Sequence, residues 1–188
     1  MSSRRSLIRK GIQKALLNET EAGTRVYTNQ SSEIWDDALP VIIITTRSES
    51  IELLNTAPRE YKRSMDVVIE VVTKGEESPN EKEDGGAEDI ADQIADKVED
   101  RLSVDDRLGT FENVFGKEVA LIDELILSNI EFEYTGEGIQ PMASARMAYR
   151  ATYYEYRPFS SEAQGITDDF NQAQTDWKDG LASDTINT

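Results

Sequence analysis

Carboxylates are the main side chains through which this sequence could do chemistry. Its 188 residues include no His and no Cys. These are the side chain most often used for proton transfer near neutral pH and the strongest soft metal ligand. Zinc-finger, haem, Cys-ligated iron–sulfur and Ser-His-Asp sites are therefore excluded. Carboxylate chemistry and hard-cation binding remain, and stability must come from packing or assembly rather than from disulfides.

Two groups of acids have a spacing that could serve a hydrolase. Asp66 and Glu70 lie on one face of an expected strand and could hold a magnesium ion, although alternation with a buried apolar face explains their spacing as well. The second group occupies the polar side of an expected helix, with no apolar neighbours to separate two pKa values. Its members are Glu88, Asp89, Asp92, Asp96, Glu99 and Asp100. We interpret the second group as a hydrated helix face and expect no catalytic residue, metal or cofactor.

Two amphipathic helices are predicted from apolar residues at helical spacing. The first spans Ser6–Glu19, with Ser6 as its N-cap, and the second spans Ala87–Leu102. Their apolar stripes are Ile8, Ile12, Ala15 and Leu16 in the first, and Ala87, Ile90, Ala91, Ile94, Val98 and Leu102 in the second. Core packing accounts for both stripes.

Several segments have the composition or alternation of strands. They are Arg25–Thr28, Val41–Thr45, Arg59–Lys74, Leu121–Tyr134 and Met142–Tyr156. The last two are expected to form a hairpin, whereas Arg47–Pro58 and Ser103–Ala120 are expected to be connections. We therefore predict an α/β (α+β) fold, in which an antiparallel sheet of about four to five strands carries two main helices.

Charge and length limit the remaining classes. The formal net charge is −17, which argues against gripping DNA through a broad cationic surface. The acidic segment 76–86 lacks the ligand pattern of a calcium-binding EF-hand loop and is expected to be solvated. No apolar run approaches the length of a membrane span, so we expect a protein that is neither membrane-bound nor exported by the usual route. The length suits one domain over residues 1–157, followed by an extension over 158–188.

Aromatic residues outside the patterned segments are candidate interface anchors. Trp35 follows Ile34 in a polar loop, and Trp is enriched at binding hot spots, although it could also fold over the edge of the core. The extension is too polar for a core of its own, yet it carries Phe159, Phe170 and Trp177. We expect these three residues to anchor an arm on a neighbouring subunit or partner.

Two arginines in the last predicted strand are further interface candidates. Arg146 and Arg150 share one face of that strand, where they could form ion pairs between subunits. Glu131 and Glu133 of the preceding strand are the local alternative, which we slightly favour.

The order of these segments resembles that of the tail terminator proteins of long-tailed bacteriophages, also called tail completion or neck proteins. The resemblance covers about residues 5–157 and rests on order, spacing and segment character. The matching pieces are LIRKGIQKALL, GTRVYTN, ALPVIIITTRSES, MDVVIEVVTKG, AEDIADQIADKVEDRL and IEFEYTGEGIQPMASARMAYRATYYEY. The acidic segment 76–86 and the extension after Arg157 lie outside the shared pattern.

The resemblance implies a structural virion protein rather than an enzyme. Proteins of this family form a six-membered ring on the head-proximal end of the tail tube, where the ring stops tube polymerisation and meets the head-completion proteins. The expected partners are therefore other copies of the chain, the tube protein, a neck protein and, in a contractile tail, the sheath. Genomic DNA would pass through without specific binding, and the protein would be assembled in the host cytoplasm. Another neck or tube component is the alternative of the same class.

Overall fold

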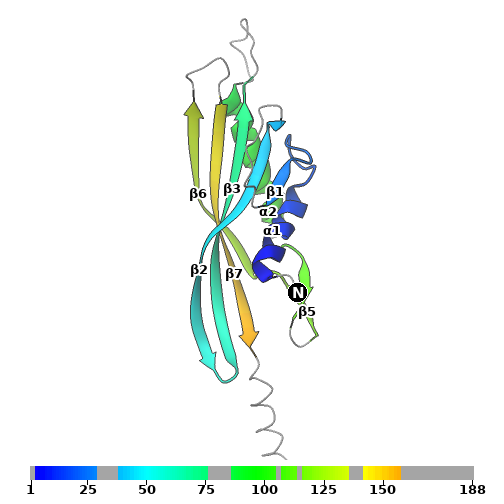
Figure 1. The fold of residues 1–188 in the computed structure, drawn as a ribbon, viewed down its shortest axis with the longest axis vertical. Coiled ribbons are helices and arrows are strands. Elements are labelled where there is room, and N and C mark those ends of the chain that lie inside the picture. Colours follow the sequence, from blue (N-terminus) through cyan, green and yellow to red (C-terminus); the bar gives the residue numbers. More distant parts are fainter. Residues whose placement is uncertain are drawn as a thin grey trace, which may run out of the picture.

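The computed structural model describes residues 3–28, 38–75, 86–104, 107–113, 116–135 and 142–157, and these form an α+β fold (Figure 1). A five-stranded sheet has the strand order β1-β2-β3-β7-β6, and a separate two-stranded sheet joins β4 to β5. The elements are α1 (Arg4–Leu16), β1 (Val26–Thr28), β2 (Val41–Thr56), β3 (Arg59–Lys74), α2 (Ala87–Val104), β4 (Thr110–Glu112), β5 (Glu118–Ala120), β6 (Glu124–Thr135) and β7 (Met142–Arg157).

The predicted fold class is confirmed. The four long strands pair antiparallel in the order β2, β3, β7 and β6, and both helices lie on one side of this sheet (Figure 1). The short strand β1 adds a parallel pairing with β2, over Ile42–Ile44. The predicted hairpin of the last two strands is also present, as β6 and β7.

The prediction that Arg47–Pro58 is a loop is wrong. β2 continues to Thr56 and pairs with β3 along almost its whole length, with register shifts after Thr46 and Leu53. Within this segment Ser50 and Glu52 alternate with Ile51 and Leu53, along a strand whose second half is largely exposed. The segment Ser103–Ala120, predicted as a connection, contains the β4–β5 hairpin.

The start of the first helix also differs from the prediction. The helix begins at Arg4, and its N-cap is Ser3 rather than Ser6. The backbone N–H of Ser6 donates to Ser3 Oγ over 3.3 Å, which satisfies one of the N–H groups that a helix leaves unpaired at its start. This earlier start places Arg4 and Arg5 in the first helical turn, where both reach the sheet.

The core lies between the helices and the sheet. Alternate residues of β3 and β7 point to this side. On β7 these are the nearly fully buried Ala143, Ala145, Met147, Tyr149, Ala151 and Tyr153. The opposite face of the sheet is covered by no helix in the part of the chain that the structure describes (Figure 1). The protein therefore has one packed face and one open face.

Candidate functional site

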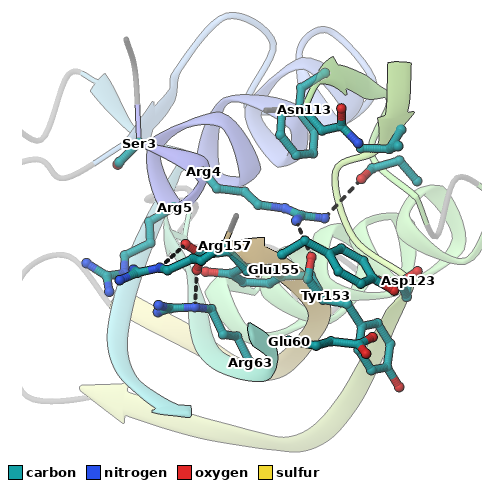
Figure 2. Close-up of a pocket in the computed structure, with 15 residues that line it drawn as sticks. Ser3, Arg4, Arg5, Glu60, Arg63, Asn113, Asp123, Tyr153, Glu155 and Arg157 are labelled. Atoms are coloured by element: carbon teal, nitrogen blue, oxygen red, sulfur yellow. Dashed lines mark hydrogen bonds and ion pairs between the residues drawn. The ribbon is translucent and has the colours of Figure 1, made fainter. Parts of the chain in front are cut away.

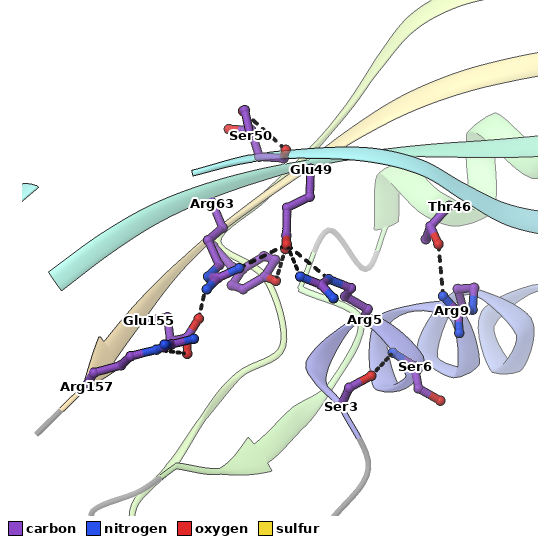
Figure 3. Close-up of polar contacts among 12 residues, drawn as sticks. Ser3, Arg5, Ser6, Arg9, Thr46, Glu49, Ser50, Arg63, Glu155 and Arg157 are labelled. Carbon is purple, nitrogen blue, oxygen red and sulfur yellow. Dashed lines mark hydrogen bonds and ion pairs between the residues drawn. The ribbon is translucent and has the colours of Figure 1, made fainter. Parts of the chain in front are cut away.

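A polar cluster joins the start of α1 to the middle of the sheet, with Glu49 of β2 at its centre (Figure 3). The Glu49 carboxylate accepts hydrogen bonds from Arg5 of α1, from Arg63 of β3 over 2.9 Å and from the hydroxyl of Tyr153 of β7. The Glu49 side chain is 9% exposed and that of Arg63 is 8% exposed. Four elements that are distant in sequence are thus tied to one nearly buried carboxylate.

The charges in this cluster keep Glu49 ionised. Burial acts to raise the pKa of Glu49, but hydrogen bonds from Arg5 and Tyr153 and the positive charges of Arg5 and Arg63 outweigh it, so the pKa lies below its ordinary value. Burial, followed by the hydrogen bond to Glu49, raises the pKa of Tyr153 well above its ordinary value. Near neutral pH Glu49 therefore stays ionised and Tyr153 stays protonated. The two side chains are suited to holding the elements together rather than to proton transfer.

The cluster continues towards the end of β7. Arg63 Nε is in ionic contact with Glu155, without the alignment of a hydrogen bond, and Arg157 Nε donates to Glu155 Oε1 over 2.9 Å. The guanidinium of Arg157 also lies over the ring of Tyr61, 5.7 Å from its centroid. These contacts connect β3 and β7 where both strands extend beyond the helices.

Arg4 fixes the start of α1 to β7, to β5 and to the residue that follows β5 (Figure 2). Its guanidinium donates to three backbone carbonyls, those of Leu121 at 2.8 Å, Ala120 at 3.1 Å and Tyr154 at 2.7 Å. The same group lies 4.5 Å from the ring centroid of Phe111 and 4.4 Å from that of Tyr153. Burial is the main cause that lowers the pKa of Arg4 from its ordinary value.

A cleft of about 870 Å³ lies between the start of α1, the β4–β5 hairpin and the ends of β3 and β7 (Figure 2). Arg4, Arg5, Arg63 and Arg157 all line it, and each already contacts a carboxylate or backbone carbonyls. In the described part of the chain, no group of three or more acidic residues is arranged to hold a metal ion. The geometry of this region is that of a structural junction.

The predicted interface arginines lie on the open face of the sheet. Arg150 Nε is 3.6 Å from Asp66 Oδ1 of β3, and both side chains are about half exposed. Arg146 lies in register between Glu70 of β3 and Glu131 of β6, and Glu131 is one of the local partners predicted for it. The partner of Arg150 is therefore Asp66 of β3, rather than either of the two glutamates of β6 that were predicted as local partners.

The two acids of the hydrolase hypothesis each face a cation. Asp66 accepts a hydrogen bond from Ser48 Oγ and forms the ion pair with Arg150. Glu70 is in register with Arg146 on the same face of the sheet. Cross-strand charge pairing explains the spacing of these acids without a bound ion.

The other predicted interface residues, Ile34, Trp35, Phe159, Phe170 and Trp177, lie outside the described residues. The structure adds a set of exposed apolar side chains that the sequence analysis did not select. They are Ile51, Leu53 and Leu54 on β2, and Ile126, Phe132 and Tyr134 on β6. Alternation of Ile51 and Leu53 with Ser50 and Glu52 was the signal that could have identified the strand carrying the first group.

Comparisons with known proteins leave the family open. No protein-family model matches the chain, and no curated protein matches it significantly. Among the described residues, no helix is long and apolar enough to cross a membrane.

Proposed function

We propose that this protein forms a ring that caps the head-proximal end of a bacteriophage tail tube. The ring ends tube polymerisation and joins the tail to the neck proteins of the head. On this proposal the protein belongs to the virion, in the neck of the tail, and it acts by assembly rather than by catalysis. The resemblance of residues 5–157 to tail terminators motivates the proposal.

The observation that carries the proposal is the shape of the sheet. β2, β3 and β7 each have 16 residues, whereas strands in globular proteins usually have 3–10. At about 3.3 Å per residue these strands span roughly 50 Å, and they extend beyond the helices (Figure 1). Ile51, Leu53 and Leu54 on the extended part are each about half exposed. A long sheet with apolar side chains in solvent is suited to contacts with other chains.

The charge of the chain fits a channel for DNA. A ring of six copies would carry roughly −100 charges, since each chain carries −17. Such a ring would repel phosphates and would not bind DNA that moves through it, in contrast to the cationic surface of a DNA-gripping protein. Acidic side chains that line the bore would therefore keep the passage non-adhesive.

A tail-tube protein or another neck component is the second candidate. A contact between two different surfaces of the same chain closes into a ring only when the rotation between copies allows it, and otherwise builds a filament. The open sheet described above suits both assemblies. The two functions differ in the product, because a tube subunit lengthens the polymer whereas a terminator fixes its length.

The test is the mass of the purified protein by light scattering over a range of salt concentrations, with electron microscopy of the assemblies. A closed ring that stops elongation when added to polymerising tube protein of the same virus is the expected result. Long filaments formed by the protein alone would favour the tube protein. A protein that neither forms rings nor alters tube length would overturn the proposal.

A further inference from the structure

In the part of the chain that the structure describes, one edge of the sheet has no strand beside it. β6 is the last strand of the sheet, and no other strand lies beyond it in the described part of the chain (Figure 1). Natural edge strands are guarded by charged side chains, above all Lys, by Pro, by β-bulges or by a covering segment. β6 has the sequence ELILSNIEFEYT, with no Lys, Arg or Pro, and its guards are three Glu and one irregularity in its pairing with β7, between Leu127 and Asn129. Its free backbone N–H and C=O groups are a template for the addition of another strand.

The other edge of the sheet is open over a similar length. β1 pairs only with Ile42–Ile44 of β2, so no described strand lies beside the part of β2 from Arg47 to Thr56. In that part Ile51 is 53% exposed and Leu53 is 50% exposed. Among the described residues the sheet therefore has two free edges, of 12 residues on β6 and ten on β2.

Four of the exposed apolar side chains of the two edges lie on the helix side of the sheet, whereas Ile126 of β6, in register with Arg150, lies on the open face. Phe132 of β6 is in register with Ala145, which is buried beneath the helices, so its ring is on the helix side. Tyr134 stacks on Phe132 from the same side, with ring centroids 6.4 Å apart. Ile51 of β2 is in register with Arg63, whose partner Glu49 contacts α1, and it therefore lies on that side too.

Strand directions decide how two such edges would meet. β2 and β7 run one way, and β3 and β6 run the other way, because each neighbouring pair is antiparallel. Rotation about the axis of a ring preserves the direction of each strand along that axis. β6 of one copy and β2 of the next would therefore meet antiparallel, with the helices of both copies on the same side of the sheet.

We propose that β6 of one copy pairs antiparallel with Arg47–Thr56 of β2 of the next copy, so that the sheet continues from subunit to subunit. The joint places Phe132 and Tyr134 of one copy on the same face as Ile51 and Leu53 of its neighbour, where they contribute to one apolar strip. This inference rests on the proposed ring, and it names the two surfaces that build that ring.

Charge favours this arrangement over a twofold pairing of two β6 strands. β6 carries Glu124, Glu131 and Glu133 on its open face, in register with Thr152, Arg146 and Ser144 of β7. Pairing β6 with itself would bring six carboxylates to one face of a single joint, and like charges across strands are destabilising. The β2 edge instead offers Arg47 and carries two acids. Glu49 lies on the helix side and is neutralised by Arg5 and Arg63, and Glu52, on the open face, is in register with Lys62 of β3.

Two lysine-blocked variants and one control test the joint. Phe132→Lys with Tyr134→Lys blocks the β6 edge, and Ile51→Lys with Leu53→Lys blocks the β2 edge. Val104→Lys is the matched control, because Val104 is 82% exposed and lies at the end of α2, outside both edge strands. The side chains altered in the two blocked variants are 41–53% exposed, so circular dichroism and thermal unfolding are expected to show folded proteins. Native mass spectrometry then gives the size of each assembly.

The expected result is that neither blocked variant forms a ring, whereas the control does. A mixture of the two blocked variants retains one intact β6 edge and one intact β2 edge, so it is expected to give heterodimers and nothing larger. A β2-blocked variant that dimerises alone would overturn the joint in favour of β6 pairing with itself. Rings formed by both blocked variants would overturn the joint while leaving the proposed function in place. Wild-type protein that forms no ring, even on tube ends, would count against both.

Discussion

Replacement of Glu49 by Gln tests whether the buried cluster holds α1 against the sheet. The carboxylate is 9% exposed and accepts hydrogen bonds from Arg5, Arg63 and Tyr153. Removing one partner of a buried ion pair costs about 3–5 kcal/mol. Arg63 keeps its contact with Glu155 in the variant, so we take about 2 kcal/mol for the loss of the ion pair between Glu49 and Arg63. The half-exposed Arg5 adds about 0.5 kcal/mol, and the Tyr153 hydroxyl adds about 0.5 kcal/mol.

Glu49→Gln is therefore expected to lower the free energy of unfolding by about 3 kcal/mol, measured by urea denaturation at pH 7. The matched control is Glu52→Gln, at an exposed position of the same strand, which is expected to change stability by less than about 0.5 kcal/mol. A loss below about 1 kcal/mol in Glu49→Gln would refute the view that this carboxylate is a structural clamp.

The difference in the free energy of unfolding between wild type and Glu49→Gln should also depend on pH, which provides an independent check. The pKa of Glu49 in the folded protein is depressed below its ordinary value of 4.5. A depressed folded pKa contributes stability that is fully present above the unfolded pKa and is lost as the pH falls through the folded pKa. The gap between wild type and Glu49→Gln should therefore be constant from neutral pH down to about 5.5 and should narrow below about 4.5. A gap that stays constant down to pH values at which the protein unfolds would contradict the assignment.

Three further substitutions test packing around the helices. Tyr149→Phe is expected to leave stability unchanged or raise it by up to about 1 kcal/mol in thermal unfolding, because the buried Tyr149 hydroxyl has no hydrogen-bond partner among the described residues. Gly11→Ala is expected to lower the free energy of unfolding by about 1–3 kcal/mol, since the added Cβ would lie 2.9 Å from the carbonyl oxygen of Leu108. Lys10→Ala, at an exposed position, is its control. Equal stabilities of the two variants would contradict the close approach. Arg4→Lys is expected to lose about 2 kcal/mol in urea denaturation, because an ammonium cannot keep three carbonyls and two rings as partners, and a loss below about 0.5 kcal/mol would show that the stacking adds little.

The sequence predicts most elements of this fold because their periodicities are local. Helix α2 has an uninterrupted apolar stripe, and β3 and β7 alternate over long stretches, so spacing alone identifies them. The second half of β2 escaped prediction because both of its faces are exposed after Glu49, so its alternation covers only Ser50–Leu53 and marks no buried face. Its pairing with β3, rather than its own composition, makes it a strand.

The polar cluster could not be predicted from local patterns. Glu49 lies in the segment interpreted as a loop, and its partners are 44, 14 and 104 residues away in the chain. No spacing rule links such positions in a single sequence, because only the register of β2, β3 and β7 brings them together. The ion pair between Asp66 and Arg150 was missed for the same reason, since it depends on the pairing of β3 with β7.

The use of arginines inside this molecule bears on how copies could associate. Arg4, Arg5 and Arg63 are engaged in fastening α1 and β2 to the rest of the sheet, so these cations are not available to offset the charge of a neighbour. Two chains of net charge −17 repel one another, and the repulsion between exposed charges extends over about 10 Å at 0.1 M salt. An interface between copies must therefore gain its stability from backbone hydrogen bonds and apolar contacts. The two open strand edges, with their exposed Ile, Leu, Phe and Tyr side chains, offer both kinds of contact.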